Sequence, residues 1–179
     1  MPIEFTLRPE TPADSAAITE VTVAAFRTLD ISSHTEQLIV EALRAAGALS
    51  VSLVAEADGR LIGHIAFSPV SISDGTAGWY GLGPVSVLPE FQRQGVGKAL
   101  IEEGLARLKA LGAKGCCLVG HPDYYPKFGF VNTADLMLDG VPPEAFFALA
   151  FAGRIPQGKV TFHPAFMAGL SEDSAGGGT

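Results

Sequence analysis

The residues best suited to chemistry stand between Gln92 and Lys98, in the run Gln-Arg-Gln-Gly-Val-Gly-Lys. Gly95 and Gly97 remove two side chains where a helix is predicted to begin, so the unpaired backbone N–H groups of its first turn become accessible to a bulky ligand. The helix dipole and the cations Arg93 and Lys98 favour an anion at the same place. The segment therefore predicts a binding site for a phosphate or pyrophosphate.

Two common phosphate-binding motifs do not fit this segment. A P-loop would need a glycine where Gln92 stands and a hydroxyl side chain where Ala99 stands. A dinucleotide-binding fingerprint that began at Gly81 would need its third glycine at Ser86. We therefore exclude both motifs.

The elements on either side of this segment must position it. The alternating pattern of Trp79 to Val87 predicts a strand, and the apolar spacing from Val96 to Leu108 predicts a helix that ends near Gly112. The short apolar run at 116–119 predicts a short buried strand. Such short links imply a parallel strand pair with a right-handed crossover, so we expect strands 79–87 and 116–119 to be neighbours, with a ligand at their carboxyl ends.

The remaining patterns predict an α/β (α+β) fold with a mixed central sheet flanked by helices. A strand is expected at 4–8, a first helix from about 12 to 26 and a second from 34 or 35 to 46. Strands at 50–55 and 61–72 are joined by an Asp58-Gly59 hairpin turn. Beyond Val131, strand-like runs at 136–138 and 159–162 and a helix or turn at 142–149 are expected to complete the sheet.

Length and composition favour one compact domain. The chain has 179 residues, 47% of them hydrophobic, and a net charge of -7, which argues against a nucleic-acid binder. We expect a single domain over residues 1–170 and a disordered tail at 171–179. No apolar run is long enough to span a bilayer and the amino terminus does not resemble a signal peptide, so a soluble cytoplasmic protein is expected. Neither the cysteines nor the histidines have the spacing of a metal site, so no metal is predicted.

Two motifs make the chain resemble the GNAT acetyltransferase superfamily. Gln92, Gly95 and Gly97 fit that family's pattern Gln/Arg-x-x-Gly-x-Gly/Ala directly after a strand. The family's second signature, a tyrosine four residues before a Gly-Phe pair, is met by Tyr125 and the pair at 129–130. The predicted order of elements also matches the GNAT acyl-CoA N-acyltransferase fold. The run Tyr-Tyr-Pro-Lys-Phe-Gly-Phe and the later His-Pro-Ala-Phe at 163–166 resemble a branch of predicted acetyltransferases labelled YhbS-like.

The resemblance implies direct transfer of an acetyl group from acetyl-CoA to an amine of a small molecule or a protein, with acetyl-CoA as the cosubstrate. Tyr125 would be the general acid that protonates the departing thiolate. The cofactor would bind to the strand end and the glycine turn, at Val85, Ser86, Val87, Gln92, Arg93, Gln94, Gly95, Val96, Gly97 and Lys98. An alternative is a non-catalytic acyl-CoA-binding sensor or regulatory module. The expected partners are acetyl-CoA and an amine, without nucleic acid or membrane, and we also allow for a homodimer.

Several roles stay open at this level. His121, His64 and Glu36 are candidates to receive the proton of the attacking amine, although an ordinary surface or hydrogen-bonded role is the more common one for each. Tyr125 has the alternative of being a packing residue beside an exposed Tyr124. Many family members carry an asparagine where this chain has Leu118, which puts one cofactor contact in doubt. The acceptor and the acyl-chain preference do not follow from the sequence.

Overall fold

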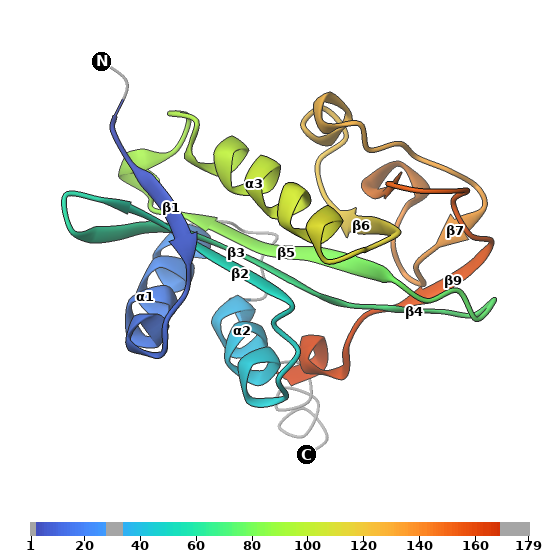
Figure 1. The fold of residues 1–179 in the computed structure, drawn as a ribbon, viewed down its shortest axis with the longest axis horizontal. Helices are drawn as coiled ribbons and strands as arrows, with labels where there is room; N and C mark the ends of the chain where they lie inside the picture. The colour runs from blue at the N-terminus through green and yellow to red at the C-terminus, as the bar shows by residue number, and fades with distance from the viewer. Residues whose placement is uncertain (1–2, 28–33, 169–179) are drawn as a thin grey trace.

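A six-stranded mixed sheet forms the centre of the molecule (Figure 1). The computed structural model describes residues 3–27 and 34–168. The strand order is β1-β2-β3-β5-β6-β8, and only the β5–β6 pair is parallel. The strands are β1 (Thr6–Pro9), β2 (Val51–Ala57), β3 (Arg60–Pro69), β5 (Trp79–Val87), β6 (Gly115–Val119) and β8 (Phe146–Ala150). The predicted mixed sheet and the predicted parallel neighbours are both confirmed.

Helices cover both faces of this sheet, as Figure 1 shows. The helix α3 (Val96–Ala110) lies on one face, where a Cβ placed on Gly63 would contact Leu100 and Val96. The helices α1 (Ser15–Phe26) and α2 (Glu36–Ala45) lie on the other, where Val54 clusters with one buried residue from each helix. Because strand side chains alternate, residues of β3 next to Gly63 point toward α1 and α2.

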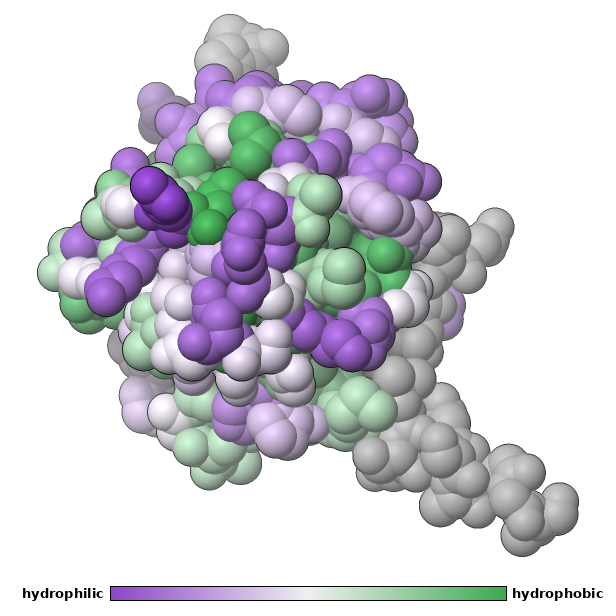
Figure 2. All heavy atoms as spheres, turned by 90° about the vertical axis from the view of Figure 1, so that its right-hand side faces the viewer, coloured by the Kyte–Doolittle hydropathy of each residue, from purple (hydrophilic) through white to green (hydrophobic). Residues whose placement is uncertain are grey.

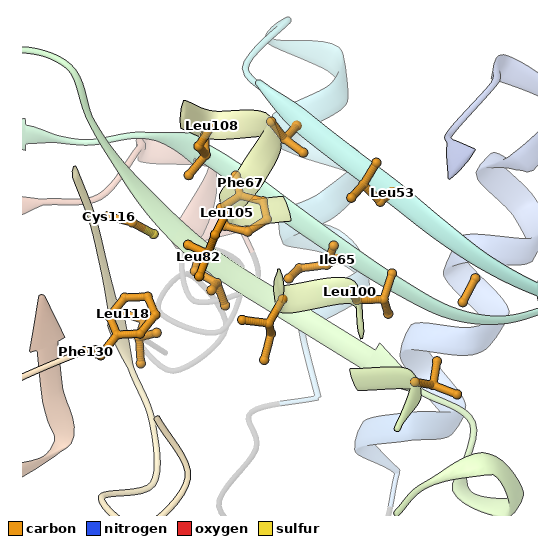
Figure 3. Close-up of a cluster of buried hydrophobic side chains, with 14 of the residues drawn as sticks. Leu53, Ile65, Phe67, Leu82, Leu100, Leu105, Leu108, Cys116, Leu118 and Phe130 are labelled. Atoms are coloured by element: carbon orange, nitrogen blue, oxygen red, sulfur yellow. The ribbon is translucent and has the colours of Figure 1, made fainter. Parts of the chain in front are cut away.

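The main core lies between α3 and the sheet. Figure 3 shows Leu100, Leu105 and Leu108 of α3 among side chains of β2, β3, β5 and β6. Fully burying each such leucine contributes about 1.5–3 kcal/mol. Gly104 lies on the same helix face, directly against the ring of Phe67, with no room for a Cβ. This close approach of helix to sheet fixes where the amino-terminal end of α3, and with it the glycine turn, is held.

A second, three-stranded sheet has the order β4-β9-β7, with strands β4 (Ser71–Ile72), β9 (Gly158–Thr161) and β7 (Leu136–Met137). Figure 2 shows the end of the molecule that carries this sheet, where hydrophobic and hydrophilic residues are mixed over the surface. The single strand predicted at 61–72 is wrong, because the chain leaves the central sheet at Pro69, which has no N–H for a ladder, and enters the small sheet at Ser71.

The carboxyl-terminal part differs most from the sequence-based expectation. The helix or turn predicted at 142–149 is a single 3-10 turn, η4 (Pro143–Ala145), followed directly by the strand β8. Short apolar runs are ambiguous between helix and strand, and pairing with β6 decides this one. The other 3-10 turns are η1 (Pro12–Asp14), η2 (Pro89–Phe91), η3 (Tyr125–Phe128) and η5 (Pro164–Met167). The predicted tail, residues 171–179, lies outside the described residues.

Candidate active site

The glycine turn joins the end of β5 to the start of α3. Gly95 caps the helix in a left-handed conformation, with φ of 89°, which a glycine adopts without strain. Arg93 also has a positive φ of 63°, which is uncommon for a residue with a side chain. The Gln92 side chain donates a hydrogen bond of 3.0 Å to the carbonyl of Val87. The turn is therefore fastened to the carboxyl end of β5 and presents the first turn of α3 beside it.

The neighbouring strand leaves one edge of β5 open. In the described structure β5 pairs with β6 only over Trp79–Gly81, although it continues to Val87. On its other side β5 pairs with β3, and the N–H of Leu88 donates to the carbonyl of Ile62. Since hydrogen-bonded pairs alternate along antiparallel strands, the backbone groups of Ser86 face β3, whereas those of Val85 and Val87 face the open edge.

A cleft of about 450 Å³ lies along this open edge. Its walls come from β5, the glycine turn, α3, η3 and the last turn of α1. The lining residues are Ala25, Phe26, Val85, Val87, Gln92, Arg93, Gly95, Gly97, Lys98, Ile101, Tyr124, Tyr125 and Lys127. The charged side chains among them are all cationic, and the Tyr124 hydroxyl lies 3.7 Å from where a Cβ of Gly97 would stand. The cleft therefore suits an extended, anionic ligand.

Tyr125 reaches this cleft from η3, and its ring is held by other aromatic rings. The ring centroids of Phe130 and Phe147 lie 6.1 and 6.0 Å from that of Tyr125. Burial, with a smaller contribution from Tyr124, raises the pKa of Tyr125 to about 12. Its phenol therefore keeps its proton at neutral pH and can donate a hydrogen bond into the cleft.

The structure brings most of the residues predicted for the site together. Side chains or Cα atoms of Val85, Val87, Gln92, Arg93, Gly95, Gly97, Lys98 and Tyr125 all line the one cleft. Ser86, Gln94 and Val96 do not line it: the side chains of Ser86 and Val96 are buried, and the Gln94 amide donates to the carbonyl of Glu90. The cofactor-binding role predicted for the three stays a prediction, for which the backbone N–H groups of Gln94 and Val96 are available, whereas the backbone groups of Ser86 face β3.

The three candidates for the proton acceptor lie elsewhere. His121 is exposed, and its Nδ1 accepts a hydrogen bond of 3.2 Å from the Asp123 N–H. Glu36 begins α2, and His64 is fully buried beneath α1 and α2. Cys116 and Cys117 are also buried; burial raises the pKa of both thiols, that of Cys117 to about 12, so neither is suited to be a nucleophile.

The sequence did not predict several of the residues that line the cleft. Ala25 and Phe26 come from the end of α1, about 60 residues before the strand that they face. Lys127 places its Nζ 3.9 Å from the ring centroid of Tyr124, a cation–π contact that holds this ammonium at the mouth of the cleft. The signal available in the sequence for Lys127 was its position two residues after Tyr125.

Comparisons with known proteins agree with this geometry. A model of the acetyltransferase (GNAT) domain matches residues 48–132. The uncharacterized N-acetyltransferase YhbS of Escherichia coli K12 is 34% identical over 125 residues, which cover 69% of this chain and 72% of YhbS. This chain belongs to the GNAT family. The uncharacterized N-acetyltransferase YjhQ of the same strain is 32% identical over 129 residues, 70% of this chain and 69% of YjhQ.

Two solved structures of GNAT proteins also resemble this GNAT protein closely. A GNAT family acetyltransferase from Brucella melitensis, in complex with acetyl-CoA, has a TM-score of 0.82 and 51% identity, covering 91% of this chain and 98% of its own. YhbS from Escherichia coli, in complex with CoA, has a TM-score of 0.82 and 31% identity, covering 92% of both chains. In the described part of this GNAT protein, no helix is long and apolar enough to cross a membrane, and no group of His, Cys, Asp and Glu side chains could hold a metal ion.

Proposed function

We propose that this protein transfers the acetyl group of acetyl-CoA directly to an amine of a small molecule or a protein. The observation that carries the proposal is one cleft that combines an open strand edge, a cationic helix start and a protonated phenol. These are the three features that an acyl thioester with a pantetheine arm and a pyrophosphate would use. The two solved GNAT relatives with CoA or acetyl-CoA bound support the same cosubstrate.

The cleft fits acetyl-CoA group by group. The amides of the pantetheine arm would pair with the backbone groups of Val85 and with the N–H of Val87, as an added strand does, while the Val87 carbonyl accepts from Gln92. The pyrophosphate would bind the backbone N–H groups of residues 93–98, beside the side chains of Arg93 and Lys98. A neighbouring groove contains Lys98, Lys109 and Lys127, together with Glu102, which pairs with Lys98. Its lysines would bind the remaining phosphate of acetyl-CoA.

The reaction needs two further contributions from the protein. The amine nitrogen attacks the thioester carbonyl, a C–N bond forms and the C–S bond breaks. A backbone N–H of β5 near Val87 would stabilise the negative charge on the carbonyl oxygen, which contributes about 3 kcal/mol in comparable sites. The Tyr125 hydroxyl would donate its hydrogen to the departing sulfur. The thiolate that leaves is a weaker base than the phenolate of a tyrosine. The acceptor amine, a cytoplasmic location, a homodimer and the 1–170 domain boundary stay predictions.

Calorimetric titration with acetyl-CoA tests the proposal. Wild-type protein should bind with micromolar affinity. Gly97→Trp should abolish binding by filling the cleft, because a Cβ on residue 97 would lie only 3.8 Å from Cγ2 of Val87 on the opposite wall. Ala110→Trp is the matched control, because it places the same ring on the same helix about 20 Å away. Absence of binding to wild type at millimolar acetyl-CoA would contradict the proposal.

A further inference from the structure

A buried polar chain runs through the face of the sheet beneath α1 and α2. His64 of β3 is 0% exposed, and its Nε2 lies 2.8 Å from the Ser52 hydroxyl of β2. That hydroxyl is in turn hydrogen-bonded to the carboxylate of Glu10, which follows β1. Arg44 of α2 holds the same carboxylate with two hydrogen bonds, of 2.9 and 3.1 Å. Four elements therefore fix the orientation of one imidazole.

These hydrogen bonds also determine which nitrogen of the His64 imidazole carries the proton. Burial alone would raise the pKa of Glu10, but hydrogen bonds from His64, Arg44 and Ser52 outweigh it and lower the pKa to about 2. The ionised carboxylate only accepts, so the Ser52 hydroxyl donates to Glu10 and accepts from Nε2–H of His64. The proton is therefore on Nε2, and Nδ1 is a bare lone pair, which makes it the basic atom.

Among residues 3–27 and 34–168, nothing hydrogen-bonds to this basic atom or to a hydroxyl directly opposite it. His64 and Ser86 are cross-strand partners of β3 and β5, and Nδ1 and the Ser86 Oγ are both buried and unpaired. Cβ atoms of such partners stand about 5 Å apart, which leaves the two polar groups within reach of one bridging water. Buried polar groups are rarely left unpaired, so we expect one water to bridge this pair.

The pair of His64 and Ser86 lies directly behind the wall of the cleft. Ser86 stands between Val85 and Val87, which both line the cleft. The helix α1 covers the pair with its buried face, which contains Thr22, and Ala25 one turn later lines the cleft as well. The cleft thus reaches the sheet face on which His64 lies, the face opposite α3.

We infer that His64 receives the proton of the attacking amine, through the Ser86 hydroxyl and the water that bridges it to Nδ1. The inference rests on the proposed function. As the C–N bond forms, the nitrogen loses one proton to this relay; as the C–S bond breaks, Tyr125 gives its proton to the sulfur and then takes one from solvent through the cleft. His64 then returns its proton to solvent through the cleft after the products leave, and Glu10 stabilises the transient imidazolium. His64 touches no substrate atom and acts as a relay residue.

The charges around His64 set its pH dependence. In the described part of the chain, Glu10 and Arg44 are the charged groups that face it, and the buried face of α1 contributes Ile18, Val21, Thr22 and Ala25. Burial lowers the pKa of His64, and Glu10 partly opposes this. His64 is therefore neutral at neutral pH, and the transfer rate should fall at acidic pH as it becomes protonated.

Three single variants test the relay. CoA release is followed over about pH 5 to 9 with a panel of primary amines: alkyl diamines, polyamines, amino-acid amides and a lysine peptide. His64→Gln should lower kcat about 100-fold and remove the acidic limb of the pH profile, and Ser86→Ala should lower kcat about tenfold. Ser68→Ala is the matched control. Like Ser86, Ser68 has a buried hydroxyl without a partner among the described residues, but it lies on β3 and its cross-strand partner is Gly81. Unchanged kcat and pH profile in His64→Gln would overturn the inference.

Two further measurements separate this inference from the proposed function. All three variants should bind acetyl-CoA with wild-type affinity by calorimetry, since their side chains lie outside the cleft. If wild type binds acetyl-CoA but releases no CoA with any amine, the transfer function fails, and nitrogen NMR of labelled histidine decides the state of His64. A bare Nδ1 on His64 supports the relay geometry, and a proton on Nδ1 overturns it.

Discussion

The ring of Tyr125 lies so close to Gly120 that a methyl group on residue 120 would overlap it. Gly120 directly follows β6, and its N–H donates a hydrogen bond of 2.9 Å to the carbonyl of Ala145. The end of β6 is thereby fixed, and the ring rests on it from one side while Phe130 and Phe147 contact it from others. The absence of a side chain at residue 120 thus sets where the phenol enters the cleft.

Gly120→Ala should therefore impair turnover without removing a chemical group. The new methyl group forces the Tyr125 ring to move, and a displacement of about 1 Å in a reacting group can lower rates about 100-fold. We expect such a loss in kcat for acetyl transfer to whichever amine the wild type accepts, with acetyl-CoA affinity changed by less than a few-fold. A kcat equal to that of wild type would show that the ring position does not limit the reaction.

Tyr125→Phe should lower kcat by about 100-fold as well, because it removes the hydroxyl that donates to the departing sulfur. The ring contacts are kept, so binding of acetyl-CoA by calorimetry should change little. Tyr124→Phe is the matched control: its hydroxyl lies beside Gly97, at the phosphate end of the cleft, and its loss should affect affinity more than kcat. The reverse pattern in the two variants would assign the acid role to Tyr124.

Gly104→Ala should destabilise the fold, although alanine is the better helix former. A Cβ at residue 104 would collide with the fully buried ring of Phe67, and overpacking of this kind costs about 1–3 kcal/mol. Denaturant unfolding would measure the loss. Phe67→Leu in the same chain should relieve the collision, so the double variant should lose less than the sum of the single variants; simple additivity would contradict the contact.

Stability should fall in two steps as the pH is lowered. The pKa of His64 in the fold lies below its usual value, so below about pH 6.5 the unfolded chain binds a proton that the folded chain does not, and stability decreases. Below about pH 4.5 the same holds for Glu10, whose pKa is lowered to about 2. Below about pH 4 it holds for Asp14 as well, because its hydrogen bonds from Arg8 are the main cause that lowers its pKa.

Thermal unfolding at about pH 7.5, 5.5 and 4 would measure both steps. His64→Gln should lose the first step and keep the second, whereas Glu10→Gln should reduce the second. His121→Gln is the control for the first step, because that histidine is exposed. If the melting temperature of wild type stays constant between about pH 7.5 and 5.5, the conclusion that His64 is neutral in the folded protein is wrong.

Local patterns made much of the site predictable. The strand from Trp79 to Val87 has the bounds that alternation predicted, and Gly95 caps α3 with the positive φ that only glycine adopts freely. Both features depend on residues close together in the chain. The parallel partner followed from the short links on either side of α3, because chain connection and handedness leave few alternatives.

Features that depend on distant residues could not be predicted in this way. The open edge of β5 arises because β6 separates from it after three residue pairs, and how far two strands pair is set by the whole sheet. The orientation of His64 needs Glu10, Ser52 and Arg44, which come from the residue after β1, from β2 and from α2. The strand β8 was missed because the apolar run that forms it has no period of its own and takes its structure from β6.

Arg93 gives the last prediction, because its backbone and its side chain make opposite contributions. The left-handed backbone of Arg93 costs about 1 kcal/mol for a residue with a Cβ, and such strain often occurs at functional sites. Arg93→Gly relieves the strain but adds chain entropy to the unfolded state, so the free energy of unfolding should change by less than about 1 kcal/mol.

The loss of the Arg93 guanidinium from the cleft should lower acetyl-CoA affinity about tenfold, or ~1.4 kcal/mol. Calorimetry at low and high salt would measure this loss, which should shrink as salt screens the charge. Arg154→Gly, which removes an equal charge from an exposed loop position outside the cleft, should leave the affinity unchanged. Equal affinities for wild type and Arg93→Gly would remove Arg93 from the phosphate site and leave its backbone strain without a function.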